Sequence, residues 1–167
     1  NADDPRVAGM AAQTRATVRS FGLSEAADVR AVDVASDGLR GVTFTLRAPW
    51  GELRVRSASP GRHLVPHALA AAAVAERFAV PLVDVAAALE AGSHAPHRMA
   101  IEEMPGGATL VDDTYNASPV SVAAALEFLA ETPVGRGRRL AVLGDMLELG
   151  SDERVLHEQI GTRAAAV

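Results

Sequence analysis

The chain has 167 residues, 49% of them hydrophobic, which is enough to bury the core of one or two small domains. Its net charge of −5 at pH 7 argues against a nucleic-acid-binding surface, which would need a basic face. Cysteine is absent and all 16 basic residues are arginine, so these residues supply no disulfide, no thiolate nucleophile and no P-loop lysine.

The first third of the chain predicts a short helix and then an antiparallel hairpin. Pro5, which follows an aspartate, is typical of the first turn of a helix. The segment "RATVRSFGL" (residues 15–23) predicts a strand. From residue 28 to 57 apolar and polar residues alternate, as in "VTFTLRAPWGELRVR", and the turn around Trp50 predicts that two such strands pair as a hairpin.

Two helices and a change in composition come next. Residues 59–80 predict an alanine-rich helix that the chain enters through a Pro-Gly pair, and residues 81–92 predict a second helix that ends at a glycine. The segment "SHAPHR" (residues 93–98) has the composition of a linker. We therefore expect two domains, residues 1–96 and residues 97–167.

The second domain predicts strands that alternate with helices. The expected strands cover residues 98–104, 108–113 and 138–146, and the expected helices cover residues 118–131 and 151–167. Ser118 and Ser151 are plausible N-caps, and Pro119 suits the first position of its helix. Strand, helix, strand, helix in this order predicts right-handed parallel crossovers and therefore an α/β fold.

Two polar loops follow predicted strands, at the sheet edge where α/β proteins bind ligands. In residues 112–118, the carboxylates of Asp112 and Asp113 could accept hydrogen bonds from ribose hydroxyls, and Tyr115 could stack on a base. The same carboxylates could instead cap the coming helix and favour its positive end. In residues 144–150, an aspartate between two glycines could be functional or could form a turn.

The histidines and the arginine near the predicted boundary could bind a ligand or could be ordinary solvated or packed side chains. His63 and His67 are four residues apart, and His94 and His97 could complete a metal cluster with them. Because no glutamate lies between the first two, as it does in H-E-x-x-H, we favour solvated or packed histidines and predict no metal site. Arg98 could bind a phosphate or could simply be solvated.

Five motifs taken together resemble the Mur ligase family. They are "NADDP", "GRH…ALAAAAVA", "HRM", "DDTYNASP" and "LGDMLELG", and their order and separations extend the resemblance over essentially the whole chain. The last two are closest to the form found in members that add D-alanyl-D-alanine to UDP-N-acetylmuramoyl-tripeptide. The resemblance implies the second half of a central ATPase-type domain, followed by the first half of a Rossmann-like C-terminal domain.

The activity that the resemblance implies is amide bond formation driven by ATP in the synthesis of peptidoglycan precursors. Family members activate a carboxylate as an acyl phosphate, which the incoming amine attacks, and they use ATP and Mg²⁺. Because the chain begins at Asn1 without a methionine, we expect an internal fragment that is inactive alone, with the P-loop and the Mg²⁺ ligands outside it. Two alternatives are another Mur or folylpolyglutamate synthase-type ligase, and a non-catalytic module that binds a nucleotide or a partner.

Location can be predicted from hydropathy and cysteine usage. The longest apolar run, residues 68–75, is far shorter than the roughly 20 residues that span a bilayer. The absence of cysteine suits a reducing compartment. We therefore expect a cytoplasmic protein without a membrane span.

The resemblance also implies roles for individual residues of the second domain. Arg98 corresponds to the family arginine that reaches the ATP phosphates, and it is the one catalytic residue implied. Asp113 corresponds to the aspartate that binds the ribose region. Tyr115 and Asn116 occupy the neighbouring part of the same loop.

In the first domain the sequence departs from the family pattern. His63 corresponds to the histidine of G-x-H-N-x-x-N, whose two asparagines approach the adenine. Leu64 and His67 stand where those asparagines would be. Leucine cannot form a hydrogen bond with adenine but histidine can, so we expect adenine recognition to depend on His67 or to be weakened.

Overall fold

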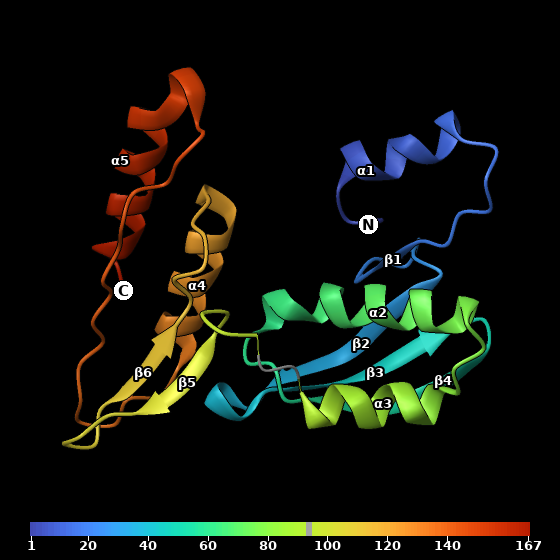
Figure 1. Cartoon of the computed structure of the whole chain (residues 1–167), viewed down its shortest axis with the longest axis horizontal. Coiled ribbons are helices and arrows are strands. Elements are labelled where there is room, and N and C mark those ends of the chain that lie inside the picture. Colours follow the sequence, from blue (N-terminus) through green and yellow to red (C-terminus); the bar gives the residue numbers. More distant parts are fainter. Residues whose placement is uncertain (93–94) are drawn as a thin grey trace. The chain divides into compact units, whose positions relative to one another are not determined.

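The computed structural model describes residues 1–92 and 95–167 (Figure 1). The chain divides into two compact units, Asn1–Ser93 and His94–Val167, and each has its own hydrophobic core. Among the described residues, no helix has the length and apolar character needed to cross a membrane. The mixed α/β fold class predicted from the sequence is confirmed.

The first unit is built on a four-stranded sheet with strand order β1-β2-β3-β4. The strands are β1 (Phe21–Gly22), β2 (Val29–Ser36), β3 (Val42–Ala48) and β4 (Gly51–Ser57). Strands β3 and β4 form the antiparallel hairpin that the alternating sequence predicts, with Phe44 opposite Val55. Val42, Phe44 and Leu46 are buried on one face of β3, because successive side chains of a strand point to opposite sides of the sheet.

Helices α2 (Val65–Arg77) and α3 (Leu82–Ala91) pack against this sheet (Figure 1). Leu69 of α2 and Val85 of α3 lie in the same buried cluster as Phe44. Both helices were predicted, and Gly92 ends α3 with a φ of 79°, which lies in the left-handed region. Burying each large side chain of this cluster contributes roughly 1.5–3 kcal/mol of hydrophobic stabilisation, so the core fixes how the helices lie on the sheet.

The N-terminal segment differs from the prediction in one respect. Helix α1 (Pro5–Gly9) begins at Pro5 as expected, and the side chain of Asp4 caps it by accepting from the Arg6 amide. The strand predicted over residues 15–23 is confirmed only at Phe21–Gly22, which pairs with β2, and is wrong for residues 15–20. Residues 15–19 are exposed, so no apolar face of theirs packs on the core and holds them in the sheet.

The second unit contains a hairpin and two helices. Strands β5 (Ala100–Glu103) and β6 (Thr109–Asp112) are antiparallel, and a Pro-Gly-Gly turn at residues 105–107 joins them. Helix α4 (Pro119–Glu131) packs against helix α5 (Glu153–Ala164). The buried cluster of this unit consists of Leu126 from α4, Ile160 from α5 and Met146 from the loop before α5.

Two expectations for the second unit are wrong. Residues 138–146 form no strand, and the described residues of this unit therefore contain no parallel crossover. Leu140 and Val142 are 83% and 88% exposed, because no strand or helix among the described residues pairs with them or covers them. Ser151 does not cap α5; it lies in the 3₁₀ turn Gly150–Asp152, and its hydroxyl donates to Asp152.

Candidate functional site

The loop between β6 and α4 does not need its aspartates to start the helix. Ser118 caps α4, because its Oγ accepts from the Ser121 amide at 3.2 Å while its own amide donates to Ser121 Oγ at 3.0 Å. This reciprocal pair is a capping box, and Pro119 occupies the first helical position. The prediction of Ser118 as N-cap is confirmed, and the interpretation of Asp112 and Asp113 as caps is wrong.

Asp112 instead binds its own loop and the segment before β5. Its Oδ1 accepts from the Thr114 hydroxyl at 2.7 Å and from the Thr114 amide at 3.0 Å. Its Oδ2 lies 2.7 Å from Nδ1 of His97. The Thr114 hydroxyl, and after it the His97 ring, hold the pKa of Asp112 below its ordinary value. The carboxylate is therefore ionised and can only accept, so Nδ1 of His97 donates.

Asp113 makes a second connection between the same two segments. One of its carboxylate oxygens accepts from the Met99 amide at 3.1 Å. A backbone bond lies beside it, in which the Tyr115 amide donates to the His97 carbonyl at 3.1 Å. The loop that follows β6 is thus bound to the three residues that precede β5.

Arg98 lies in the middle of these contacts. Its guanidinium carbon is 4.0 Å from the centroid of the Tyr115 ring, a distance at which a cation is attracted to the ring face. His97 and Met99, on either side of it, have φ values of 58° and 50°. Left-handed backbone costs roughly 1–2 kcal/mol for each residue with a Cβ, so the surrounding contacts must offset this cost.

The structure brings together some of the predicted site residues. Arg98, Asp113 and Tyr115 lie in one set of contacts, and Asn116 is next to them on the exposed loop, where its side chain accepts from the Ala117 amide. Arg98 lies over one face of the Tyr115 ring, and Tyr115 remains 65% exposed. The prediction missed His97 and Thr114 as partners of Asp112.

The other predicted ligands lie in the first unit. His63 belongs to the 3₁₀ turn Arg62–Leu64, directly before α2, and His67 is in the first turn of α2. His67 is exposed. Within residues 1–92 and 95–167, no three histidine or carboxylate side chains gather into a possible metal site, and His94 of the considered four-histidine cluster lies outside the described residues.

The loop at residues 144–150 is held by α5. The side chain of Met146 is buried, and its amide donates to Nε2 of His157 at 3.0 Å. Nδ1 of the same ring donates to the Glu153 carbonyl at 2.8 Å, which fixes the neutral tautomer of His157. Asp145 is exposed. These contacts fix Met146, near the middle of the "LGDMLELG" segment, against α5.

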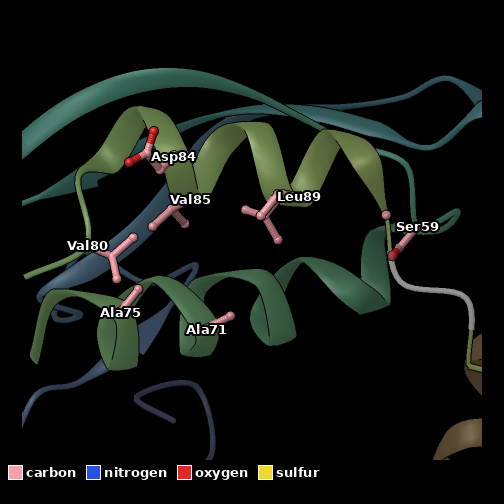
Figure 2. Close-up of a pocket in the computed structure, with 9 residues that line it drawn as sticks. Ser59, Ala71, Ala75, Val80, Asp84, Val85 and Leu89 are labelled. Carbon is pink, nitrogen blue, oxygen red and sulfur yellow. The ribbon is translucent and has the colours of Figure 1, made fainter. Parts of the chain in front are cut away.

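An open cavity of about 280 Å³ lies between α2 and α3 in the first unit. Figure 2 shows Val85 and Leu89 of α3 pointing toward α2, where Ala71 and Ala75 leave room. Only Ser59 and Asp84 give its lining polar side chains. The described lining has no basic side chain, so this cavity does not suit a triphosphate.

Comparison with known proteins gives matches along nearly the whole chain. Residues 1–75 match the Mur ligase middle domain, and residues 97–167 match the glutamate ligase domain of Mur ligases. The chain is 42% identical over 168 residues to the UDP-N-acetylmuramoyl-tripeptide–D-alanyl-D-alanine ligase of Mycobacterium tuberculosis, with 98% of the chain aligned. It spans 33% of that relative, about a third of its length.

Two further matches bear on fold and substrate. The crystal structure of MurF from Acinetobacter baumannii superposes with a TM-score of 0.80 and 32% identity, over 90% of this chain and 32% of that one. The UDP-N-acetylmuramate–L-alanine ligase of Xanthomonas campestris is 52% identical over 89 residues, which are 53% of this chain and 18% of the relative. The first match has the broader coverage and the second the higher local identity.

Proposed function

Because the chain belongs to the Mur ligase family, we propose that the full-length protein is an ATP-dependent ligase that joins D-alanyl-D-alanine to UDP-N-acetylmuramoyl-tripeptide. The observation that carries this proposal is the similarity over 98% of the chain to ligases of that name. The chain would then supply part of the ATP site of a peptidoglycan precursor ligase, which we expect to be cytoplasmic. The chain alone is expected to be inactive.

In this proposal Arg98 binds the phosphates of ATP and is the catalytic residue of the chain. A guanidinium that lies on an aromatic ring keeps its N–H edge available, and that planar fork suits phosphate oxygens. Arg98 is exposed and forms no hydrogen bond or salt bridge with any described residue. Its donors are therefore available to a ligand, where they would stabilise the charge of the phosphoryl group during transfer.

The loop after β6 provides acceptors that fit a ribose. Asp113 uses one carboxylate oxygen for the Met99 amide, so its other oxygen could accept from a ribose hydroxyl. Tyr115 and Asn116 are exposed next to it and are proposed to line the same part of the nucleotide. We assign no Mg²⁺ ligand to this chain and expect that ion to be held by other residues of the full-length protein.

Adenine recognition is proposed to involve the turn before α2. His63 and His67 lie on consecutive turns there, and an imidazole can donate or accept one hydrogen bond at each ring nitrogen. Leu64 cannot replace an asparagine in this role. His67 would therefore be the polar contact to the base on this side.

The test is the substrate dependence of phosphate release by the full-length protein. The proposal predicts that phosphate release from ATP requires both UDP-N-acetylmuramoyl-tripeptide and D-alanyl-D-alanine. A second candidate, favoured by the high local identity to the Xanthomonas campestris ligase, predicts release with UDP-N-acetylmuramate and L-alanine instead. Release with the second pair only, or with neither pair, would contradict the proposal.

A further inference from the structure

Arg98 is flanked by two residues in a backbone conformation that side chains with a Cβ seldom adopt. His97 and Met99 both have φ in the left-handed region, at 58° and 50°. Such residues are uncommon, and asparagine, aspartate and histidine account for a disproportionate share of them. Methionine has no polar group that could stabilise this conformation locally, so contacts with the rest of the unit must impose it.

Three hydrogen bonds hold the backbone on both sides of Arg98. Before it, the His97 ring donates to Asp112 at 2.7 Å and the His97 carbonyl accepts from the Tyr115 amide at 3.1 Å. After it, the Met99 amide donates to Asp113 at 3.1 Å. We call these three bonds the Arg98 brace.

The brace fixes the arginine and its aromatic platform together. The amide of Tyr115 takes part in the brace, and the ring of Tyr115 lies 4.0 Å from the Arg98 guanidinium carbon. The hairpin register explains why the two segments meet, because Ala100 pairs with Asp112 across β5 and β6. Residues directly before β5 must therefore lie beside residues directly after β6.

We propose that His97 and Asp112 are positioning residues, which act through the Arg98 brace to present the Arg98 guanidinium in one orientation to a nucleotide phosphate. The inference rests on the proposed function for the identity of the ligand, whereas the brace itself depends only on contacts within the second unit. His97 is well suited to this role because its side chain is 59% exposed. It therefore contributes little to a core, and its ring contact is with Asp112.

The alternative is that these bonds merely close the hairpin, and three variants of His97 separate the two cases. His97→Asn tolerates the left-handed conformation and has a side-chain amide N–H close to where Nδ1 donates. His97→Gly keeps the conformation and loses the donor. His97→Ala loses both. Arg136→Ala, on an exposed loop of the same unit, is the matched control.

The first measurement is steady-state ligase activity of the full-length variants. A misplaced catalytic group costs a large fraction of the rate, so we expect His97→Ala and His97→Gly to lower kcat about ten-fold or more. We expect His97→Asn to stay within about three-fold of the wild type, since it restores the donor. Equal kcat values for His97→Ala and the wild type, in an enzyme that needs Arg98, would overturn the proposal.

The second measurement does not depend on activity. Trypsin cleaves this sequence only after arginine, because lysine is absent, and the cut after Arg136 gives an internal reference. We expect His97→Ala and His97→Gly to accelerate the cut after Arg98 at least five-fold relative to the cut after Arg136, with His97→Asn close to the wild type. Unchanged relative rates would show that the brace does not hold this segment.

The two readouts distinguish failure of this inference from failure of the proposed function. If Arg98→Ala leaves turnover unchanged, the phosphate role of Arg98 fails, and the trypsin result alone decides whether the brace holds the arginine. If Arg98→Ala has a lowered kcat while His97→Gly matches the wild type in both kcat and the relative cleavage rate, the proposed function stands and the positioning role fails. His97→Gly keeps the test valid if His97→Ala is poorly folded.

Discussion

Replacing Ser118 by alanine should loosen the first turn of α4, because the Ser121 amide then loses the hydroxyl that accepts from it. Loss of a serine N-cap costs about 1 kcal/mol, within a range of roughly 0.5–2 kcal/mol. The Ser121 hydroxyl would still bond the amide of residue 118, so half of the capping box survives and a value near the middle of the range is expected.

Hydrogen exchange followed by mass spectrometry measures this effect in the full-length protein. A cost of about 1 kcal/mol corresponds to roughly five-fold faster exchange in the first turn of α4. Asp113→Asn is the matched comparison: its side-chain carbonyl can still accept from Met99, and it has no part in the cap. We expect it to leave exchange in α4 unchanged. Faster exchange of α4 in Asp113→Asn, together with an unchanged exchange rate in Ser118→Ala, would refute the assignment of the cap.

Two further predictions concern the stability of the first unit, and Trp50, the single tryptophan of these 167 residues, reports both by fluorescence when this chain is unfolded by itself. Phe44→Ala should lower the free energy of unfolding by about 3–5 kcal/mol because Phe44 is fully buried. As a control, Val83→Ala truncates an exposed side chain and should change the free energy of unfolding by at most about 0.5 kcal/mol. Equal effects of the two substitutions would contradict the assigned core. The Ser20 amide, and then the Ser20 hydroxyl, hold the pKa of Asp28 below its ordinary value of 3.8, so the stabilisation from ionised Asp28 is present above that pH and is lost as the pH falls through the lower folded-state pKa. Asp28→Asn should remove this part of the pH dependence of unfolding. An identical pH profile for the wild type and Asp28→Asn would contradict the prediction.

The elements that local sequence chemistry determines were predicted well. The hairpin of β3 and β4 follows from strict alternation and a turn, and the start of α4 follows from Ser118 and Pro119. In each case neighbouring residues decide the structure. Helix α5 shows the limit of such signals: Ser151 is an equally good cap by type, yet it lies in a 3₁₀ turn.

The errors occurred where structure depends on residues distant in the sequence. A strand over residues 138–146 would need a neighbour for its backbone hydrogen bonds, and no described strand pairs with it. By residue type alone, Asp112 and Asp113 suit helix caps or nucleotide ligands. The hairpin register adds a third role, because it brings both carboxylates to His97 and Met99.

The register was nevertheless accessible from the sequence. The Pro-Gly-Gly turn at residues 105–107 lies midway between the two predicted strands, so "HRM" at the start of the first strand must lie beside "DDTY" at the end of the second. The register of that hairpin pairs the two segments. The stacking of Arg98 on Tyr115 depends on side-chain geometry, which neither hydrophobic periodicity nor turn chemistry encodes.

The most direct test of the account is kcat of the full-length ligase after Arg98→Ala, with Arg136→Ala as the control for loss of one positive charge in the same unit. Removal of such an electrostatic contact to a reacting group typically costs on the order of 100-fold or more. We expect a loss of this size for Arg98→Ala and almost none for Arg136→Ala. Wild-type kcat and wild-type KM for ATP in Arg98→Ala would contradict it.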